Sequence, residues 1–312
     1  MLIDYIKWQQ EELDKRRQAD GMAAWKAKLQ ADKFALLPPC PGLTDAWKPL
    51  VEFKAPKEVS DRLRQLTKDG PLKKAYYNSN TDPWYIQSLE NADGTAINLD
   101  YFPIRVSSLP ILNGKQSTAA EFLEYIRLNI NHSLDQSKSS FQPHPLLMPA
   151  ESERWLNSPL GSVIMISIPG DKPFGFVGDD GSVIVSDYQP DSWTFSTIHE
   201  PQASDHPVSG NRQFGYTQNA DGSYIFYTRG ADKLTGTLDD LLGLVTKAAT
   251  GEVYQFSEAD NLWRSFQKDI ADFVNQNGGS AQKQAPVTNR PDWEKVKDAI
   301  KNNRNLSTVD CN

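Results

Sequence analysis

The sequence predicts an α+β fold, in which helices flank a small, mostly antiparallel sheet over about residues 162–230. Amphipathic stretches with apolar residues at helical spacing lie on both sides of that segment. Within it, short runs of alternating apolar and aromatic residues are separated by Asp-Gly turns, which is typical of β-hairpins. The chain of 312 residues is long enough for one large domain or two smaller ones.

The N-terminal region, residues 1–116, is predicted to be mainly helical. Residues 2–36 carry apolar side chains at roughly helical spacing, and the prolines that follow end the pattern. A second amphipathic helix follows Pro56, with three apolar residues on one face, namely Val59, Leu63 and Leu66. Alternation over 97–101 suits a short strand.

The α+β domain itself is predicted over residues 117–277. Thr118 and Glu121 form a capping-box pattern at the start of a helix. Alternating strands follow, and the turn at 219–222 joins the last two as a hairpin. Helical spacing returns at 237–249 and 257–276.

Residues 278–312 are predicted to be a linker and a C-terminal helix. The composition of 278–287 is that of a flexible linker. Residues 292–303 can form one amphipathic helix. This helix either packs back onto the protein or binds a partner, and packing back is the simpler interpretation.

Composition limits the function. The net charge is −7, the pI is about 5.2, and no basic stripe is visible, so a nucleic-acid partner is not expected. No apolar run reaches the roughly 18 residues that span a bilayer. The N-terminus lacks the order of residues of a signal peptide, so we expect a cytoplasmic protein that leaves only by a specialised route. Cys40 and Cys311 are expected to be free.

One polar, aromatic block, residues 199–232, holds the densest group of reactive side chains. We predict His206 as a general base near neutral pH, oriented by Asp205 or Asp232. Arg212 and Arg229 would bind a phosphate or carboxylate through their guanidinium groups. The catalytic candidates of the block are His199, Asp205, His206, Arg212, Arg229 and Asp232. The alternative is a structural loop held by a pair such as Arg229 with Asp232.

No cofactor is expected, with a divalent metal as the alternative. Four oxygen and nitrogen ligands occur close together in the block: His199, Glu200, Asp205 and His206. Their spacing does not match the two-histidine motif of helical zinc sites. Two histidines on a surface loop are the simpler interpretation.

Residues 118–275 resemble proteins from type VI secretion and polymorphic-toxin loci of Gram-negative bacteria. The segments that carry the resemblance are PLGSVIMI (159–166), DDGSVIVSD (179–187), WTFSTI (193–198), HPVSGNRQFG (206–215) and DGSYIFYTRGAD (221–232). The resemblance implies a protein made in the cytoplasm and delivered into the periplasm of target cells. It implies two partners, a spike or adaptor protein of the secretion apparatus and a cognate immunity protein.

Two functional hypotheses follow from these observations. The first is a bacterial antagonism effector that acts on a membrane or envelope component by hydrolysis or transfer, with its site in the polar block. The second is a non-enzymatic adaptor, chaperone or immunity-type binding protein of the same secretion system. Whether the histidine, aspartate and arginine side chains of the block converge in space distinguishes an enzyme from a binding protein.

Overall fold

The computed structural model describes residues 42–69, 83–134, 139–167, 180–203, 205–236 and 254–311. The helices predicted at 2–36 and 237–249, and Cys40, lie outside these residues. The strands are β1 (Tyr85–Ile86), β2 (Ile97–Ser108), β3 (Ile111–Leu112), β4 (Lys115–Gln116), β5 (Ser140–Pro143), β6 (Val163–Ser167), β7 (Gly181–Gln189), β8 (Ser192–His199), β9 (Val208–Gln218), β10 (Tyr224–Leu234), β11 (Ser280–Lys283) and β12 (Val287–Asn289).

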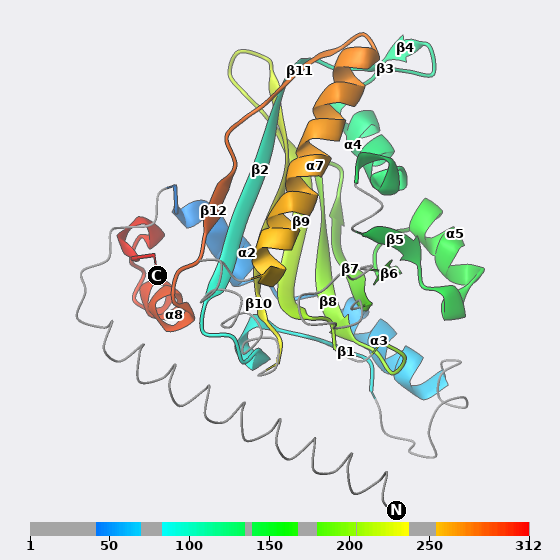
Figure 1. Ribbon diagram of the computed structural model, residues 1–312. Helices are drawn as coiled ribbons and strands as arrows, with labels where there is room; N and C mark the ends of the chain where they lie inside the picture. Colours follow the sequence, from blue (N-terminus) through cyan, green and yellow to red (C-terminus); the bar gives the residue numbers. More distant parts are fainter. Residues whose placement is uncertain are drawn as a thin grey trace, which may run out of the picture.

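The helices of the described residues differ widely in length. The α-helices are α2 (Lys48–Val51), α3 (Lys57–Asp69), α4 (Ala119–Leu128), α5 (Ala150–Asn157), α7 (Tyr254–Gln276) and α8 (Trp293–Lys301). The 3-10 turns are η1 (Asp45–Trp47), η3 (Leu89–Asn91), η4 (Ile130–Ser133), η5 (Pro145–Leu147) and η7 (Leu306–Thr308). The longest of the α-helices, α7, has 23 residues and crosses one face of a large sheet (Figure 1).

The prediction of a small sheet over about 162–230 is wrong. In the described residues, ten strands form one antiparallel sheet in the order β11-β2-β10-β9-β8-β7-β6-β5, with β1 beside β8 and β12 beside β2. Its strands come from all three of the segments predicted as separate units. For example, β2 from the first segment pairs with β10 from the second over ten residues and with β11 from the third. The sheet is therefore a shared framework and not a local feature of the central segment.

The sequence understates β2 because this strand is buried on both faces. Phe102, Ile104 and Val106 enter one core, and Ile97 and Leu99 enter another. A strand covered on both sides loses the simple alternation of apolar and polar residues. The short alternation over 97–101 therefore marks only the first part of a twelve-residue strand.

The segment predicted as a flexible linker, 278–287, contains the strand β11, and β12 begins at its last residue. β11 and β12 both pair with β2, and the pairing uses backbone groups that every sequence provides. The side chains of β11 are largely exposed, as expected at the edge of a sheet. A polar edge strand and a polar linker have the same composition, so the sequence could not separate them.

Several local predictions are confirmed. Thr118 and Glu121 form the capping box of α4, with both reciprocal hydrogen bonds present. The turn at 219–222 joins β9 to β10, and Gly222 takes the positive φ of 83° that this turn requires. The C-terminal helix α8 packs back onto the sheet through Trp293, Val296 and Ala299.

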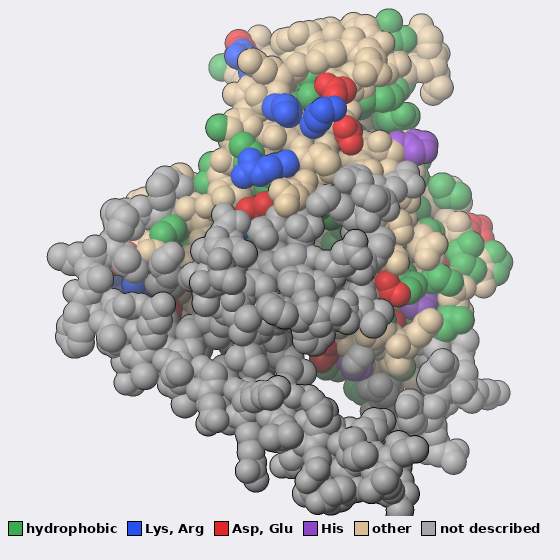
Figure 2. All heavy atoms as spheres, viewed as in Figure 1, with side chains coloured by type: hydrophobic (Ala, Val, Ile, Leu, Met, Phe, Trp, Pro, Cys, Tyr) green, Lys and Arg blue, Asp and Glu red, His purple; other side chains and the backbone are tan. Residues whose placement is uncertain are grey.

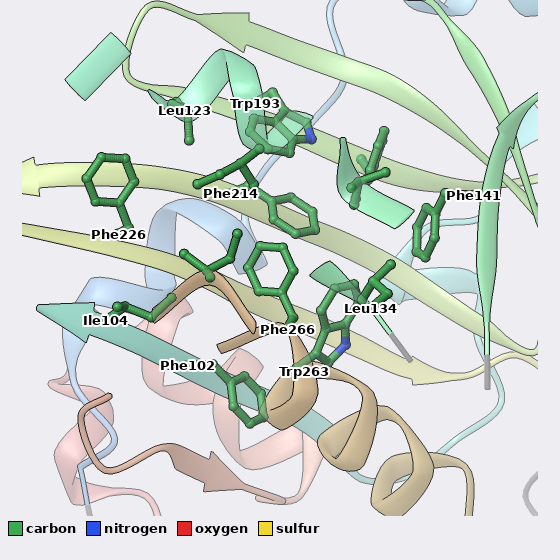
Figure 3. Packing of buried hydrophobic residues seen from close by; sticks show 14 of the residues in the cluster. Phe102, Ile104, Leu123, Leu134, Phe141, Trp193, Phe214, Phe226, Trp263 and Phe266 are labelled. Atoms are coloured by element: carbon green, nitrogen blue, oxygen red, sulfur yellow. The ribbon is translucent and has the colours of Figure 1, made fainter. Parts of the chain in front are cut away.

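The two faces of the sheet carry separate cores. We call the face toward α7 the inner face; it holds the side chains of Phe102 from β2, Phe214 from β9 and Phe226 from β10. Figure 3 shows these rings in one cluster with Trp263 and Phe266 of α7. The opposite, outer face is covered by α2 and α8 at one end and by α3 at the other.

Helix α7 is amphipathic, which explains how it covers the inner face. Trp263, Phe266 and Ile270 are buried against the sheet, whereas Lys268 pairs with Asp272 on the exposed side. Figure 2, viewed from the side of α7, shows charged side chains of both signs over its upper part. No helix in the described ranges is both long enough and apolar enough to cross a membrane.

The prediction that both cysteines are free is wrong for Cys311. Its sulfur is disulfide-bonded, and Cys40, outside the described residues, is the other cysteine of the chain. Cys311 follows η7 and lies beside Asn289 of β12.

We predict that the inner core depends strongly on Phe214, which is 1% exposed and stacks on Trp193 with ring centroids 4.6 Å apart. Phe214→Ala should lower the free energy of unfolding by about 3–5 kcal/mol, because it leaves a cavity between β9 and α7. Urea unfolding measures the change. Leu156→Ala, at a side chain that is 54% exposed, is the control and should change it by less than about 0.5 kcal/mol.

Candidate functional site

The inner face of the sheet is divided into an apolar half and a polar half. On β2, Phe102 and Ile104 point to the inner face. Asn98 and Asp100, which precede them at even-numbered positions, point to the same face because strand side chains alternate. All four residues are fully buried. The sheet therefore places an amide and a carboxylate beside the core, under the N-terminal half of α7.

A row across three strands sets the geometry of this polar half. Gly230 of β10 lies opposite Asp100 of β2 on one side and opposite Arg212 of β9 on the other. Arg212 crosses over Gly230, and its Nη2 donates to Asp100 Oδ2 at 2.6 Å. A Cβ atom at position 230 would lie 2.3 Å from that Nη2, so only glycine leaves room for the crossing.

The guanidinium of Arg212 also connects the sheet to α7. It lies over the ring of Trp263, with its central carbon 4.3 Å from the ring centroid. Its Nη1 donates to Thr228 Oγ1 at 3.3 Å, and its Nη2 lies 3.8 Å from Asp232 Oδ2. One side chain thus contacts β2, β10 and the covering helix.

A second carboxylate, Asp232, lies in the next row. It is opposite Asn98 in the register of β10 and β2, and Asn98 Nδ2 donates to both of its oxygens at 3.2 Å. The same amide nitrogen donates to Asp100 Oδ2 at 2.9 Å. Burial, and then the charge of Asp100, raise the pKa of Asp232 to about 7, against the lowering effect of Arg212.

Two buried oxygens of this cluster have no hydrogen-bond partner within the described residues. They are Asp100 Oδ1 and Asn98 Oδ1, and both residues are 0% exposed. Buried polar atoms in folded proteins are almost always paired, so these two unpaired acceptors mark this place for a functional explanation. We call Asn98, Asp100, Arg212 and Asp232 the inner-face cluster.

A second ion pair lies next to the cluster. Arg290, which follows β12, donates to both oxygens of Asp260 of α7 at 2.9 Å. Burial raises the pKa of Asp260; the pairing with Arg290 acts against this, and the charge of Asp100 adds to it. Asp260 therefore lies close enough to Asp100 for the charge of Asp100 to raise its pKa, although each carboxylate has its own guanidinium partner.

The structure places His206 away from this cluster. Its ring is buried against Gly181 of β7, and its Nδ1 contacts the carbonyl oxygen of Val208 at 2.9 Å. Its backbone amide donates to Gln87 Oε1. Burial lowers the pKa of His206 to about 4, so the ring is neutral at physiological pH.

Asp205 orients a different histidine from the one predicted. Its Oδ1 lies 2.8 Å from His199 Nδ1, and the ring of Tyr85 stacks on that of His199 with centroids 4.7 Å apart. Asp205 is half exposed, so this pair lies at the surface, where β8 ends. The predicted dyad of Asp205 and His206 is thus a pair of Asp205 and His199.

The remaining candidates lie elsewhere. Arg229 points to the outer face, where it donates to Gln213 Oε1 at 2.9 Å and to the carbonyl of Ala46. Glu200 is buried 3.7 Å from His144 and accepts from two backbone amides. Although His199 contacts Asp205, the four residues His199, Glu200, Asp205 and His206 do not form one group, and no group of three His, Cys, Asp or Glu side chains placed to hold a metal ion occurs in the described ranges.

The comparisons with known proteins add little. No family model matches the chain, and no curated protein matches it. Among solved structures, a di-domain aromatase/cyclase, StfQ, from the steffimycin pathway aligns with 58% of this chain and 51% of its own, at 10% identity and a TM-score of 0.36. The aligned region is therefore about half of StfQ.

Two other solved structures align with similar TM-scores. Ara h 8.0201 aligns at 14% identity over 57% of this chain and 99% of its own, with a TM-score of 0.33. Human STARD10 aligns at 11% identity over 72% and 83%, with a TM-score of 0.34. All three scores are below 0.5, so these likenesses carry no weight in assigning a function.

Sequence reasoning found Arg212 and Asp232 but missed Asn98 and Asp100. In the predicted strand at 97–101, the apolar positions are odd-numbered, which assigns the even positions to solvent. The continuation to Phe102, Ile104 and Val106 puts apolar residues at even positions as well. Both faces of the strand are then buried, which is the signal that could have revealed two buried polar residues.

We predict that His206 makes the protein sensitive to acid. Its pKa is lowered from 6.5 to about 4 by burial, so its contribution to stability is present above pH 6.5 and is lost as the pH falls toward 4. The free energy of unfolding of the wild type should fall between about pH 7.5 and pH 4.5. In His206→Gln this fall should be smaller by on the order of 2 kcal/mol. The exposed His132→Gln is the control; an equal change in both variants would contradict the prediction.

Asp232 should have the opposite pH dependence. Its pKa is raised from 3.8 to about 7, so its contribution to stability is present below pH 3.8 and is lost as the pH rises through 7. Asp232→Asn cannot ionise, and its stability relative to the wild type should therefore increase from pH 5 to pH 8. Thermal unfolding at both pH values measures this, with Asp269→Asn on α7 as the control. A difference that stays constant with pH would refute the assignment.

Proposed function

We propose that this chain is an acid–base enzyme of bacterial antagonism, which hydrolyses a bond in an envelope component, or transfers a group from it to an acceptor, at the inner-face cluster. The observation that carries the proposal is the pair of buried carboxylates, Asp100 and Asp232, that share Arg212 and Asn98. Pairs of carboxylates in different environments are a recurrent arrangement for general acid–base catalysis.

Asp232 is the group that would transfer the proton. A general acid–base group works best when its pKa is near the working pH, and burial brings that of Asp232 to about 7. Its side chain keeps 11% exposure, whereas that of Asp100 has none. Asp232 is therefore the carboxylate of the pair that a substrate can approach.

Asp100 and Arg212 would have electrostatic and positioning roles. Their hydrogen bond at 2.6 Å fixes the guanidinium over Gly230, and Trp263 packs against its face. A guanidinium held in this way can stabilise negative charge that develops on a reacting oxygen. The cluster thus contains a proton-transfer group, an anion stabiliser and an amide that orients both carboxylates.

The biological setting in the proposal comes from the resemblance to proteins of type VI secretion and polymorphic-toxin loci. It supplies the delivery route, the envelope as target, and the two partners, a spike or adaptor and an immunity protein. The inner-face cluster supports the enzymatic part of the proposal independently of that setting. Here Asp232, and not His206, is the proton-transfer group.

A second candidate function is a binding protein of the same system. Three large apolar side chains between the start of η5 and the end of α5 are exposed: Leu146 by 42%, Met148 by 49% and Leu156 by 54%. Large exposed apolar side chains can take part in interaction surfaces. This candidate would leave the inner-face cluster without a catalytic role.

Expression in a Gram-negative host tests the proposal, once in the cytoplasm and once with an added periplasmic signal. We predict growth inhibition in the periplasm only. Asp232→Asn should remove it, because loss of a general acid–base group lowers rates by roughly 10²–10⁴. Colony counts at matched amounts of folded protein measure the effect, with Asp269→Asn as a control that should inhibit growth like the wild type.

His206→Gln separates the two possible centres. Full inhibition by this variant, together with loss in Asp232→Asn, supports the inner-face cluster. Loss in His206→Gln alone would return the catalytic role to His206. If the wild type inhibits growth in neither compartment, the binding function becomes the better account.

A further inference from the structure

The hydrogen bonds of the inner-face cluster leave it short of donors. The described contacts of its two carboxylates come from one guanidinium, Arg212, and one amide, Asn98 Nδ2. That amide nitrogen is shared among three carboxylate oxygens at 2.9–3.2 Å. Two ionised carboxylates can accept more hydrogen bonds than these groups supply.

The unpartnered atoms of the cluster are both acceptors. Asp100 Oδ1 and Asn98 Oδ1 have no partner in the described part of the chain, and neither residue is exposed. Asp100 Oδ1 points over Gly230, because it lies 3.1 Å from where a Cβ of that residue would be. The guanidinium of Arg212 fills the space directly over Gly230, and each of the two unpaired acceptors beside it can accept a hydrogen bond from a donating group.

The charges of the cluster point the same way. Arg212 is the cation that contacts both Asp100 and Asp232, and Arg290, which pairs with Asp260, lowers the pKa of Asp232 through its charge without forming an ion pair with it among the described residues. Burial and the charge of Asp100 hold the pKa of Asp232 near 7, so a proton partly supplies the missing positive charge. A bound cation could replace that proton.

We infer that the inner-face cluster binds the ammonium group of a primary amine, with its N–H groups donating to Asp100, Asn98 and Asp232. The inference rests on the proposed function, since the amine would belong to the substrate. An ammonium group brings three donors and one positive charge in a compact form. It therefore satisfies both the orphan oxygens and the pair of carboxylates.

Other ligand classes match only part of the site. A diol offers donors but no charge, so the two carboxylates would still share one guanidinium. A quaternary ammonium brings charge without N–H donors, and Arg212 already covers a face of Trp263 that could hold it. An anion would meet Asp100 and Asp232 at close range.

Titration with propylammonium chloride, followed by ¹H–¹⁵N NMR of the full chain, tests the inference. We expect saturable shifts of the backbone amides of Asn98, Asp100 and Asp232 and of the Nε–H signal of Arg212. Tetramethylammonium chloride and propane-1,2-diol at equal concentration should bind at least about tenfold more weakly. Sodium chloride keeps the ionic strength constant throughout.

Variants locate the binding. Asp232→Asn and Asn98→Leu should each weaken propylammonium binding by about tenfold or more, whereas Asp269→Asn should leave it unchanged. If either of the first two variants does not fold, the other variant and the shifts in the wild type still show whether propylammonium binds at the inner-face cluster. Equal binding of tetramethylammonium or of the diol, or no saturable shift, would overturn the inference.

The inference and the proposed function fail separately. If propylammonium binds as expected but Asp232→Asn still inhibits growth, the cluster binds amines and the catalytic proposal is wrong. If Asp232→Asn loses inhibition and propylammonium does not bind, the catalytic proposal stands and the amine inference is wrong.

Discussion

The structure depends on one interaction, the crossing of Arg212 over Gly230 to Asp100 beneath the ring of Trp263. A long helix can cover an antiparallel sheet only if every polar group between them is paired or reaches water. The guanidinium meets this condition at the polar half of the inner face, since its edge bonds to a carboxylate and its face packs on an aromatic ring. The same side chain therefore holds β2, β10 and α7 together and sets the position of both carboxylates.

This arrangement explains why we place the candidate site on the inner face and not at the histidines. His206 and the pair of His199 with Asp205 lie at the end of the sheet, where each is held by local contacts with neighbouring backbone or rings. Arg229 is on the outer face because it is one residue away from Gly230, and adjacent strand residues point to opposite faces. Proximity in the sequence of the polar block is thus a poor guide to proximity in space, because a strand divides its residues between two layers.

The sequence predicted local structure better than long-range pairing. Features that depend on residues within one element were predicted and are confirmed: the cap at Thr118, the turn at 219–222, and the amphipathic helices α3, α7 and α8. The extent of the sheet could not be predicted in this way, because β2 pairs with β10 across more than a hundred residues, and β11 pairs with β2 through its backbone. For the site, Arg212 and Asp232 stood out by residue type within the block. Asp100 could be recognised only once the pairing of β2 placed it opposite Gly230.

The energetic cost of the inner-face cluster is itself an argument for a function. The other half of the same face, built on Phe102, Phe214 and Phe226, shows that apolar residues are enough to pack this sheet against α7. Replacing buried ion pairs with well-packed apolar side chains is often neutral or stabilising. Asp232 moreover weakens the fold above pH 7, because its buried carboxyl must ionise beside Asp100. Asp232, unlike the pair of Arg212 and Asp100, is therefore better explained by a role in the proposed site than by its own contribution to folding.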